Sequence, residues 1–79
     1  MVIKVLGSGC ANCQRLEDLA RQAVHHLGIE AEVVHVTDVR AIMSYGVMST
    51  PALVIDEQVK LAGRVPSLDQ VVDLVARAG

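Results

Sequence analysis

Two cysteines, Cys10 and Cys13, are the residues of this 79-residue sequence whose type and spacing best suit chemistry. They form a Cys-Ala-Asn-Cys motif directly after a Gly-Ser-Gly turn at residues 7–9. A disulfide between residues three apart closes almost no loop, so it would be a poor structural staple. In a cytosolic chain, a CxxC motif between a strand and a helix is instead typical of redox chemistry or metal capture.

The positions of the two thiols predict different roles for them. Cys10 falls at the expected start of a helix, where unpaired backbone N–H groups and the helix dipole stabilise an anion. Such a position can lower the pKa of a thiol from about 8.5 to about 7 or below, and the thiolate is the nucleophile of disulfide exchange. Cys13 follows by nearly one helical turn, so its sulfur projects back towards Cys10. We interpret Cys10 as the nucleophile and the deeper Cys13 as the resolving thiol.

Two other interpretations of the pair stay open from the residues alone. The cysteines could be small buried hydrophobes, although a position after a glycine-rich turn is unusual for that role. They could also capture a metal, but zinc usually takes four ligands and the motif provides two. His25 and His26 lie about 18 Å from Cys13 along the same predicted helix, and His35 falls in a predicted strand. A closed zinc site would need a dimer, so we expect no metal and no cofactor.

Four apolar segments, rich in β-branched residues, predict strands around the motif. They cover residues 2–6, 31–36, 52–55 and 58–62. Asp56 and Glu57 separate the last two segments and indicate a tight turn, so these two strands should form a hairpin.

Three segments have apolar residues at helical spacing. The first follows the cysteines, with Leu16 and Leu27 on its apolar face and Gly28 as its C-terminal cap. The second is short, begins after the candidate N-cap Asp38 and ends near Tyr45. Its expected buried residues are Val39, Ile42 and Met43. The third begins at a capping box formed by Ser67 and Gln70, and its expected buried residues are Leu68, Val71, Val72 and Val75.

These elements give the order β-α-β-α-β-β-α within a single domain, residues 1–79. Each β-α-β step predicts a parallel pair of strands joined by a right-handed crossover, and the hairpin predicts an antiparallel pair. The fold class is therefore expected to be α/β, with a four-stranded mixed sheet and helices on both faces.

Composition excludes several classes of function. Seven Lys and Arg against nine Asp and Glu give a net charge of −2, which argues against a nucleic-acid partner. The sequence has neither a run of about 18 apolar residues nor a charged-then-apolar leader, so we expect a cytoplasmic protein that does not enter a membrane. A hydrophobic content of 52% indicates a folded chain. Because Tyr45 is the one aromatic residue against 14 valines, the core must be aliphatic.

The CxxC motif after the first strand, combined with Thr50-Pro51 before the third, resembles the thioredoxin-like fold. The closest resemblance is to the small, glutaredoxin-sized thioredoxins of archaea and bacteria, and it covers essentially the whole chain. It implies that the Thr50–Pro51 peptide bond is cis, lies beside the cysteines and pairs with the backbone of a substrate. It also implies a thiol–disulfide oxidoreductase that exchanges protein disulfides through Cys10 and Cys13. Such a protein would act as a monomer in cell redox homeostasis and electron transport, recharged by a disulfide reductase.

The alternative function is a metallochaperone-like metal-binding module. Heavy-metal-associated domains are similar in size and also carry CxxC after their first strand. Their element order, however, is β-α-β-β-α-β, and they usually have Met two residues before the first cysteine, where this chain has Ser8. The final helix and the Thr50-Pro51 pair also weigh against copper transfer.

Overall fold

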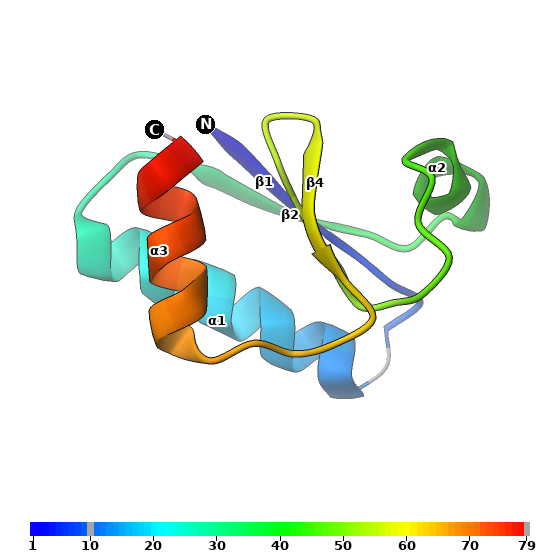
Figure 1. Cartoon of the computed structure of the whole chain (residues 1–79), viewed down its shortest axis with the longest axis horizontal. Coiled ribbons are helices and arrows are strands. Elements are labelled where there is room, and N and C mark those ends of the chain that lie inside the picture. The colour runs from blue at the N-terminus through cyan, green and yellow to red at the C-terminus, as the bar shows by residue number, and fades with distance from the viewer. Residues whose placement is uncertain (10, 79) are drawn as a thin grey trace.

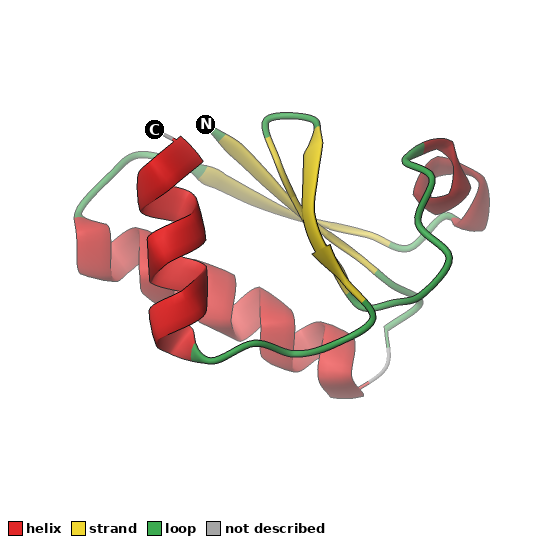
Figure 2. Cartoon of the chain, in the orientation of Figure 1, coloured by secondary structure: helices red, strands yellow, loops and turns green. Residues whose placement is uncertain are grey.

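A computed structural model describes residues 1–9 and 11–78 and contains the seven expected elements in the expected order (Figures 1 and 2). The strands are β1 (Val2–Leu6), β2 (Glu32–Val36), β3 (Ala52–Ile55) and β4 (Gln58–Ala62). The helices are α1 (Ala11–Leu27), α2 (Val39–Ser44) and α3 (Leu68–Ala78). Cys10, which we expected at the start of the first helix, lies outside the described residues.

The four strands form one mixed sheet in the order β2-β1-β3-β4. β1 pairs with β2 in parallel, as predicted, and β3 and β4 form the predicted antiparallel hairpin. The prediction of a parallel crossover from β2 to β3 is wrong, because β3 runs antiparallel to β1. Leu6 pairs with both Val36 and Ala52, so β2 ends and β3 begins at the same end of the sheet. The six residues of α2 span about 9 Å and sit at that end instead of running back along the strands (Figure 1).

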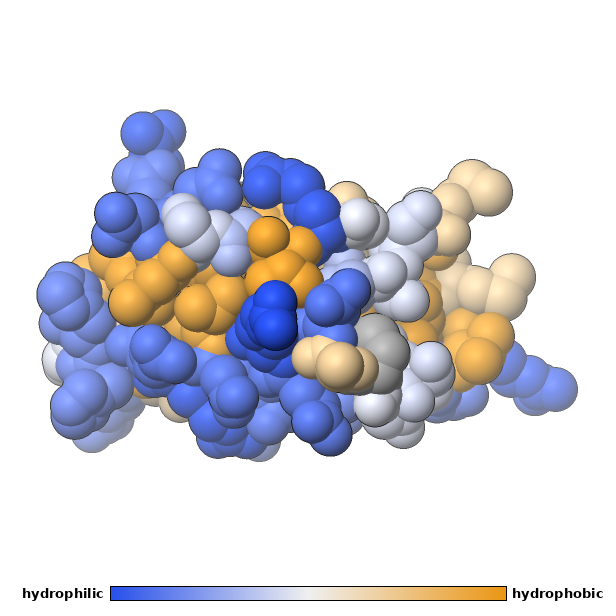
Figure 3. Space-filling view, turned by 90° about the horizontal axis from the view of Figure 1, so that it is seen from below, coloured by the Kyte–Doolittle hydropathy of each residue, from blue (hydrophilic) through white to orange (hydrophobic). Residues whose placement is uncertain are grey.

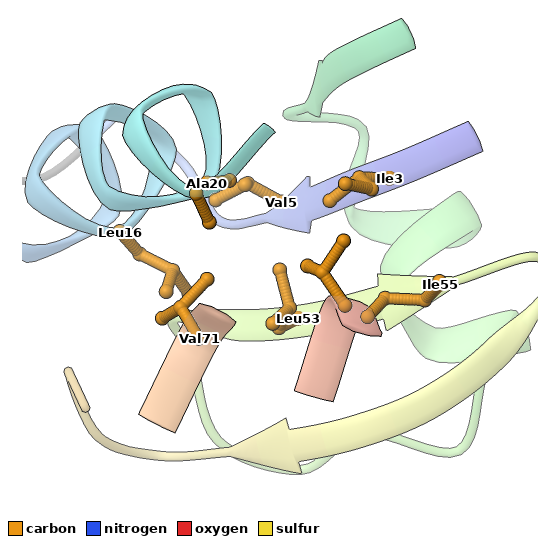
Figure 4. Packing of buried hydrophobic residues seen from close by; sticks show 9 residues of the cluster. Ile3, Val5, Leu16, Ala20, Leu53, Ile55 and Val71 are labelled. Atoms are coloured by element: carbon orange, nitrogen blue, oxygen red, sulfur yellow. The ribbon is translucent and has the colours of Figure 1, made fainter. Parts of the chain in front are cut away.

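The larger part of the core lies between the sheet and the helices α1 and α3. Side chains from β1, β3 and both helices point towards one another there (Figure 4). The fully or almost fully buried members of this cluster are Ile3, Val5, Leu16, Ala20, Ala23, Leu53, Ile55, Val71 and Val75. Complete burial of a Val, Leu or Ile side chain contributes about 1.5–3 kcal/mol, so this face provides most of the hydrophobic stabilisation.

A second, smaller cluster occupies the opposite face of the sheet, where Ile42 of α2 packs against residues of β1 and β3. Its buried members are Leu6, Ile42, Ala52 and Val54. The prediction of helices on both faces is therefore confirmed. The expectation that α2 also buries Val39 and Met43 is wrong, since these side chains are 61% and 68% exposed. A helix of fewer than two turns, set at the end of the sheet, presents only one of its side chains to the core.

The residues predicted to cap the helices and to form the hairpin turn do so in the structure. Asp38 is the N-cap of α2 and accepts a hydrogen bond from the backbone N–H of Arg40 at 3.3 Å. The capping box of α3 is complete, because Ser67 N donates to Gln70 Oε1 and Gln70 N donates to Ser67 Oγ, at 3.1 and 3.3 Å. Between β3 and β4, both turn residues have left-handed backbone conformations, with φ of 48° and 68°. Those two positive φ values are typical of a type I′ hairpin turn.

Three polar side chains on the α2 face form a closed hydrogen-bonded triangle. Lys4 Nζ donates to Tyr45 Oη at 2.8 Å and to Glu57 Oε1 at 2.5 Å, and Tyr45 Oη donates to Glu57 Oε2 at 3.0 Å. These contacts connect β1, the end of α2 and the β3–β4 turn. The hydrogen bond from Lys4 is the larger cause of the lowered pKa of Glu57, and the hydrogen bond from Tyr45 is the next largest. The hydrogen bond between Lys4 and Glu57 also raises the pKa of Lys4.

We expect Glu57 to contribute to stability in a pH-dependent way. Its pKa is lowered in the folded state, so its contribution is complete above the unfolded-state pKa of about 4.5 and is lost as the pH falls through the lower folded-state value. The difference in free energy of unfolding between the wild type and Glu57→Gln should thus shrink from pH 7 to pH 3 in urea titrations. Glu30→Gln, at an exposed loop carboxylate, is the matched control. A difference that stays constant over this range would contradict the role of the triangle.

Candidate active site

Cys13 is completely buried in the first turn of α1 and packs against Gly7, the residue that follows β1. A Cβ atom added at position 7 would overlap Cys13 Sγ and lie 3.2 Å from Cys13 Cβ. The same atom would lie 3.8 Å from Thr50 Cβ. The structure therefore brings Gly7, Cys13 and Thr50 together around one point, and the absence of a side chain at Gly7 makes room for the sulfur.

The segment Thr50-Pro51 lies at the start of β3, and the peptide bond between the two residues is cis. Pro51 is buried and its carbonyl accepts a hydrogen bond from Gly63 N at 2.9 Å, whereas Thr50 is exposed. Gly63 has φ of 81°, and a Cβ there would lie 3.1 Å from Ser49 Cβ. The loop after β4 thus presses directly against this segment, while Thr50 faces solvent beside the buried Cys13.

The backbone of Gly7 is held on both sides by the last two residues of β2. Gly7 N donates to Val36 O at 3.0 Å, and Gly7 O lies 3.2 Å from His35 Nε2. The other ring nitrogen of His35 lies 3.2 Å from Glu17 Oε1 on α1. From the sequence, His35 is a candidate only as a metal ligand away from the cysteines, and Glu17 is not among the predicted site residues. The available signal was that Glu17 follows Cys13 by four residues, which places both on one face of a helix.

An apolar groove of about 220 Å³ adjoins Thr50 and runs over α2. All of its lining residues are uncharged: Ser8, Val39, Ile42, Met43, Val47, Met48 and Thr50. Met48 is 97% exposed, so together with Val39 and Met43 it leaves a large apolar surface in contact with water. Figure 3 shows hydrophobic surface at the α2 end of the molecule. Exposed apolar side chains that cluster in this way are common at surfaces that bind other molecules.

Within residues 1–9 and 11–78, no group of three or more Cys, His, Asp and Glu side chains is arranged to hold a metal ion. His25 and His26 are exposed at the far end of α1, as the helix geometry predicted. His35 is directed to Gly7 and Glu17.

Comparison with known proteins identifies the family. Residues 1–76 match the family model described as "Thioredoxin domain". The chain belongs to the thioredoxin family. It is similar to the protein named "Thioredoxin" of Methanothermobacter thermautotrophicus, with 42% identity over 71 residues, which cover 90% of this chain and 92% of the relative. It is also 37% identical over 71 residues to the "Thioredoxin" of Methanocaldococcus jannaschii, covering 90% of this chain and 81% of that relative.

Membership of the thioredoxin family confirms the predicted fold and reaction class, which is thiol–disulfide oxidoreduction. The observed element order, β-α-β-α-β-β-α, also differs from the β-α-β-β-α-β order of heavy-metal-associated domains. No helix in the described part of the chain is long and apolar enough to cross a membrane.

Proposed function

We propose that this member of the thioredoxin family exchanges the disulfides of protein substrates, with Cys10 as the attacking thiolate and Cys13 as the resolving thiol. The observation that carries the proposal is the position of Cys13. Its sulfur is buried against Gly7 and lies beside the exposed Thr50, next to the apolar groove. A buried thiol is shielded from external thiols, so it suits reaction with the neighbouring cysteine of its own motif.

The proposed reaction has two exchange steps. The Cys10 thiolate attacks a substrate disulfide, forms a mixed disulfide and releases one substrate sulfur as a thiolate. Cys13 then gives up its proton and attacks the Cys10 sulfur, so that the Cys10–Cys13 bond forms as the bond to the substrate breaks. Two electrons pass to the substrate, and the second substrate sulfur leaves as a thiolate. A disulfide reductase must return two electrons before the next cycle.

We assign substrate binding to Thr50 and Pro51. Burial of Pro51 and its hydrogen bond with Gly63 hold the segment in place, while the exposed Thr50 remains accessible to the backbone of a substrate. The uncharged apolar groove beside it favours a protein surface as the substrate over a small charged disulfide.

Met48→Asp should lower kcat/KM for a protein disulfide about ten-fold, because a charge replaces apolar surface that the substrate covers. The rate with a small aromatic disulfide should change less than two-fold. Stopped-flow reduction of insulin and of 5,5′-dithiobis(2-nitrobenzoate) measures the two rates. Val59→Asp, a change at an exposed apolar residue of β4, is the matched control. Equal losses with both substrates would argue against the groove as a docking surface.

The proposed function is tested by equilibrating the protein with glutathione redox buffers and by following insulin reduction with NADPH and a thioredoxin reductase. We expect the cysteine pair to cycle between dithiol and disulfide, and insulin to be reduced catalytically. A pair that does not cycle in these buffers would refute the proposal.

We also propose that the protein works as a monomer in the cytoplasm. Both thiols of the motif belong to one chain, and a dithiol of this kind is kept available in a reducing compartment. Light scattering should give a mass near 8.4 kDa, whereas a stable dimer would overturn the first part of this proposal.

A further inference from the structure

His35 connects helix α1 to Gly7, the residue that forms the wall of the space around the Cys13 sulfur. Its side chain is 22% exposed and that of Glu17 is 23% exposed, so the contact between them is partly shielded from solvent. Nε2 contacts Gly7 O and Nδ1 contacts Glu17 Oε1, each at 3.2 Å. Glu17 is further held by Arg21, whose Nε lies 3.4 Å from the other carboxylate oxygen. Arg21 is thus connected to Gly7 through the side chains of Glu17 and His35. Gly7 is the residue against which the Cys13 sulfur packs.

The two contacts of His35 have distinct chemical requirements. A carbonyl oxygen only accepts, so the contact with Gly7 is a hydrogen bond when Nε2 carries the hydrogen. The contact with the ionised carboxylate of Glu17 requires a hydrogen on Nδ1. Both hydrogen bonds form together when the ring is an imidazolium, and this form is also the one that pairs with a carboxylate.

The position of Gly7 matters because nothing separates it from the sulfur. A Cβ atom at position 7 would overlap Cys13 Sγ, so a shift of the Gly7 peptide changes the space in which the sulfur sits. Gly7 N is fixed by Val36 O within the β1–β2 pairing, which leaves the carbonyl side to be fixed by His35. Thiol attack on a disulfide depends on alignment of the reacting sulfurs, and small misplacements of reacting groups slow such steps strongly.

We propose that His35, anchored by Glu17, is a positioning residue that holds Gly7 so that Cys13 is aligned for the resolving step. The inference rests on the proposed function of Cys13. In that step Cys13 loses its proton to solvent and its sulfur bonds to the Cys10 sulfur, while the Cys10–substrate bond breaks and the substrate leaves as a thiolate. We expect His35 to act on the second step, because its ring contacts Gly7 and the Cys13 sulfur packs against that residue.

Two substitutions separate the contacts of His35. His35→Gln places an amide N–H near the position of Nε2 and can keep the hydrogen bond to Gly7. His35→Asn places its amide nearer to the position of Nδ1, so it can reach Glu17 but not Gly7. Loss of one such hydrogen bond corresponds to about a five-fold change in rate. His25→Asn, at an exposed histidine of α1, is the matched control.

The reduced proteins are mixed with excess 5,5′-dithiobis(2-nitrobenzoate) in a stopped-flow instrument. The first thionitrobenzoate is released when Cys10 attacks the reagent, and the rate of this phase rises with the concentration of the reagent. The second is released when Cys13 attacks the mixed disulfide, and the rate of this phase does not depend on the concentration of the reagent. We expect His35→Asn to slow the second phase about five-fold and His35→Gln to slow it less than two-fold, with the first phase almost unchanged. Glu17→Ala should slow the second phase less than His35→Asn does, because the hydrogen bond from His35 to Gly7 O can still form without the Glu17 anchor.

Equal slowing of the second phase by His35→Asn and His35→Gln would overturn the inference, as would equal slowing of both phases. Urea midpoints of the variants show whether a general loss of stability accompanies either pattern. A wild-type protein that releases only one equivalent would refute the role of Cys13 itself and the inference with it. That outcome appears in the unmodified protein, so it is distinct from a failure of His35 alone.

Discussion

Cys10→Ser should abolish the reduction of protein disulfides, whereas Cys13→Ser should turn the protein into a covalent trap for its substrates. Without Cys10 no attacking thiolate remains. Without Cys13 the attack still occurs, but the mixed disulfide has no internal thiol to release it. Insulin reduction measures the first effect. Non-reducing gels of a lysate mixed with Cys13→Ser measure the second, and mass spectrometry of the trapped species identifies the substrates.

Alkylation of the wild-type protein provides an independent test of the two roles. Cys13 is completely buried, so iodoacetamide should modify Cys10 much faster near neutral pH. Gln22→Ala, a change at an exposed residue of α1 that keeps both thiols, is the matched control for the variants. Equal alkylation of the two cysteines, or trapping of substrates by Cys10→Ser, would reverse the assigned roles.

The features that sequence predicted correctly are those that depend on neighbouring residues. The capping box of Ser67 and Gln70, the N-cap Asp38 and the hairpin turn at residues 56–57 each involve groups within three positions of one another. Their geometry is determined by the local chain, whatever packs against it. The spacing along α1 also located its apolar face, on which Leu16 is buried and Leu27 is partly buried against the same cluster.

The features that sequence missed depend on where distant segments meet. The direction of β3 depends on α2 staying at one end of the sheet, and a strand-helix-strand pattern does not reveal this. Val39 and Met43 follow a helical apolar pattern but remain exposed, because only one side of the short α2 contacts the sheet. The contact between His35 and Glu17 joins residues 18 positions apart across two elements, and neither residue stands in a recognisable motif.

Gly7→Ala should both destabilise the fold and impair the resolving thiol, although it adds only one methyl group. The new Cβ would overlap Cys13 Sγ inside a closed pocket, and overpacking of this kind costs about 1–3 kcal/mol of the free energy of unfolding. Gly7 lies outside the left-handed region, so the cost arises from the overlap and not from backbone strain. Urea unfolding measures the loss of stability, and the unimolecular phase of thionitrobenzoate release measures the effect on Cys13.

A double-mutant cycle with Cys13→Ala separates the overlap from any other effect of the methyl group. Removing Sγ removes the atom with which the new Cβ collides, while the 3.2 Å approach to Cys13 Cβ remains. Gly7→Ala should therefore destabilise the Cys13→Ala background by clearly less than it destabilises the wild type, because residues in direct contact do not act additively. If the two costs are equal, Gly7 and the Cys13 sulfur do not share the space that the structure assigns to them. The cost of Gly7→Ala would then have a cause other than the loss of room for the Cys13 sulfur.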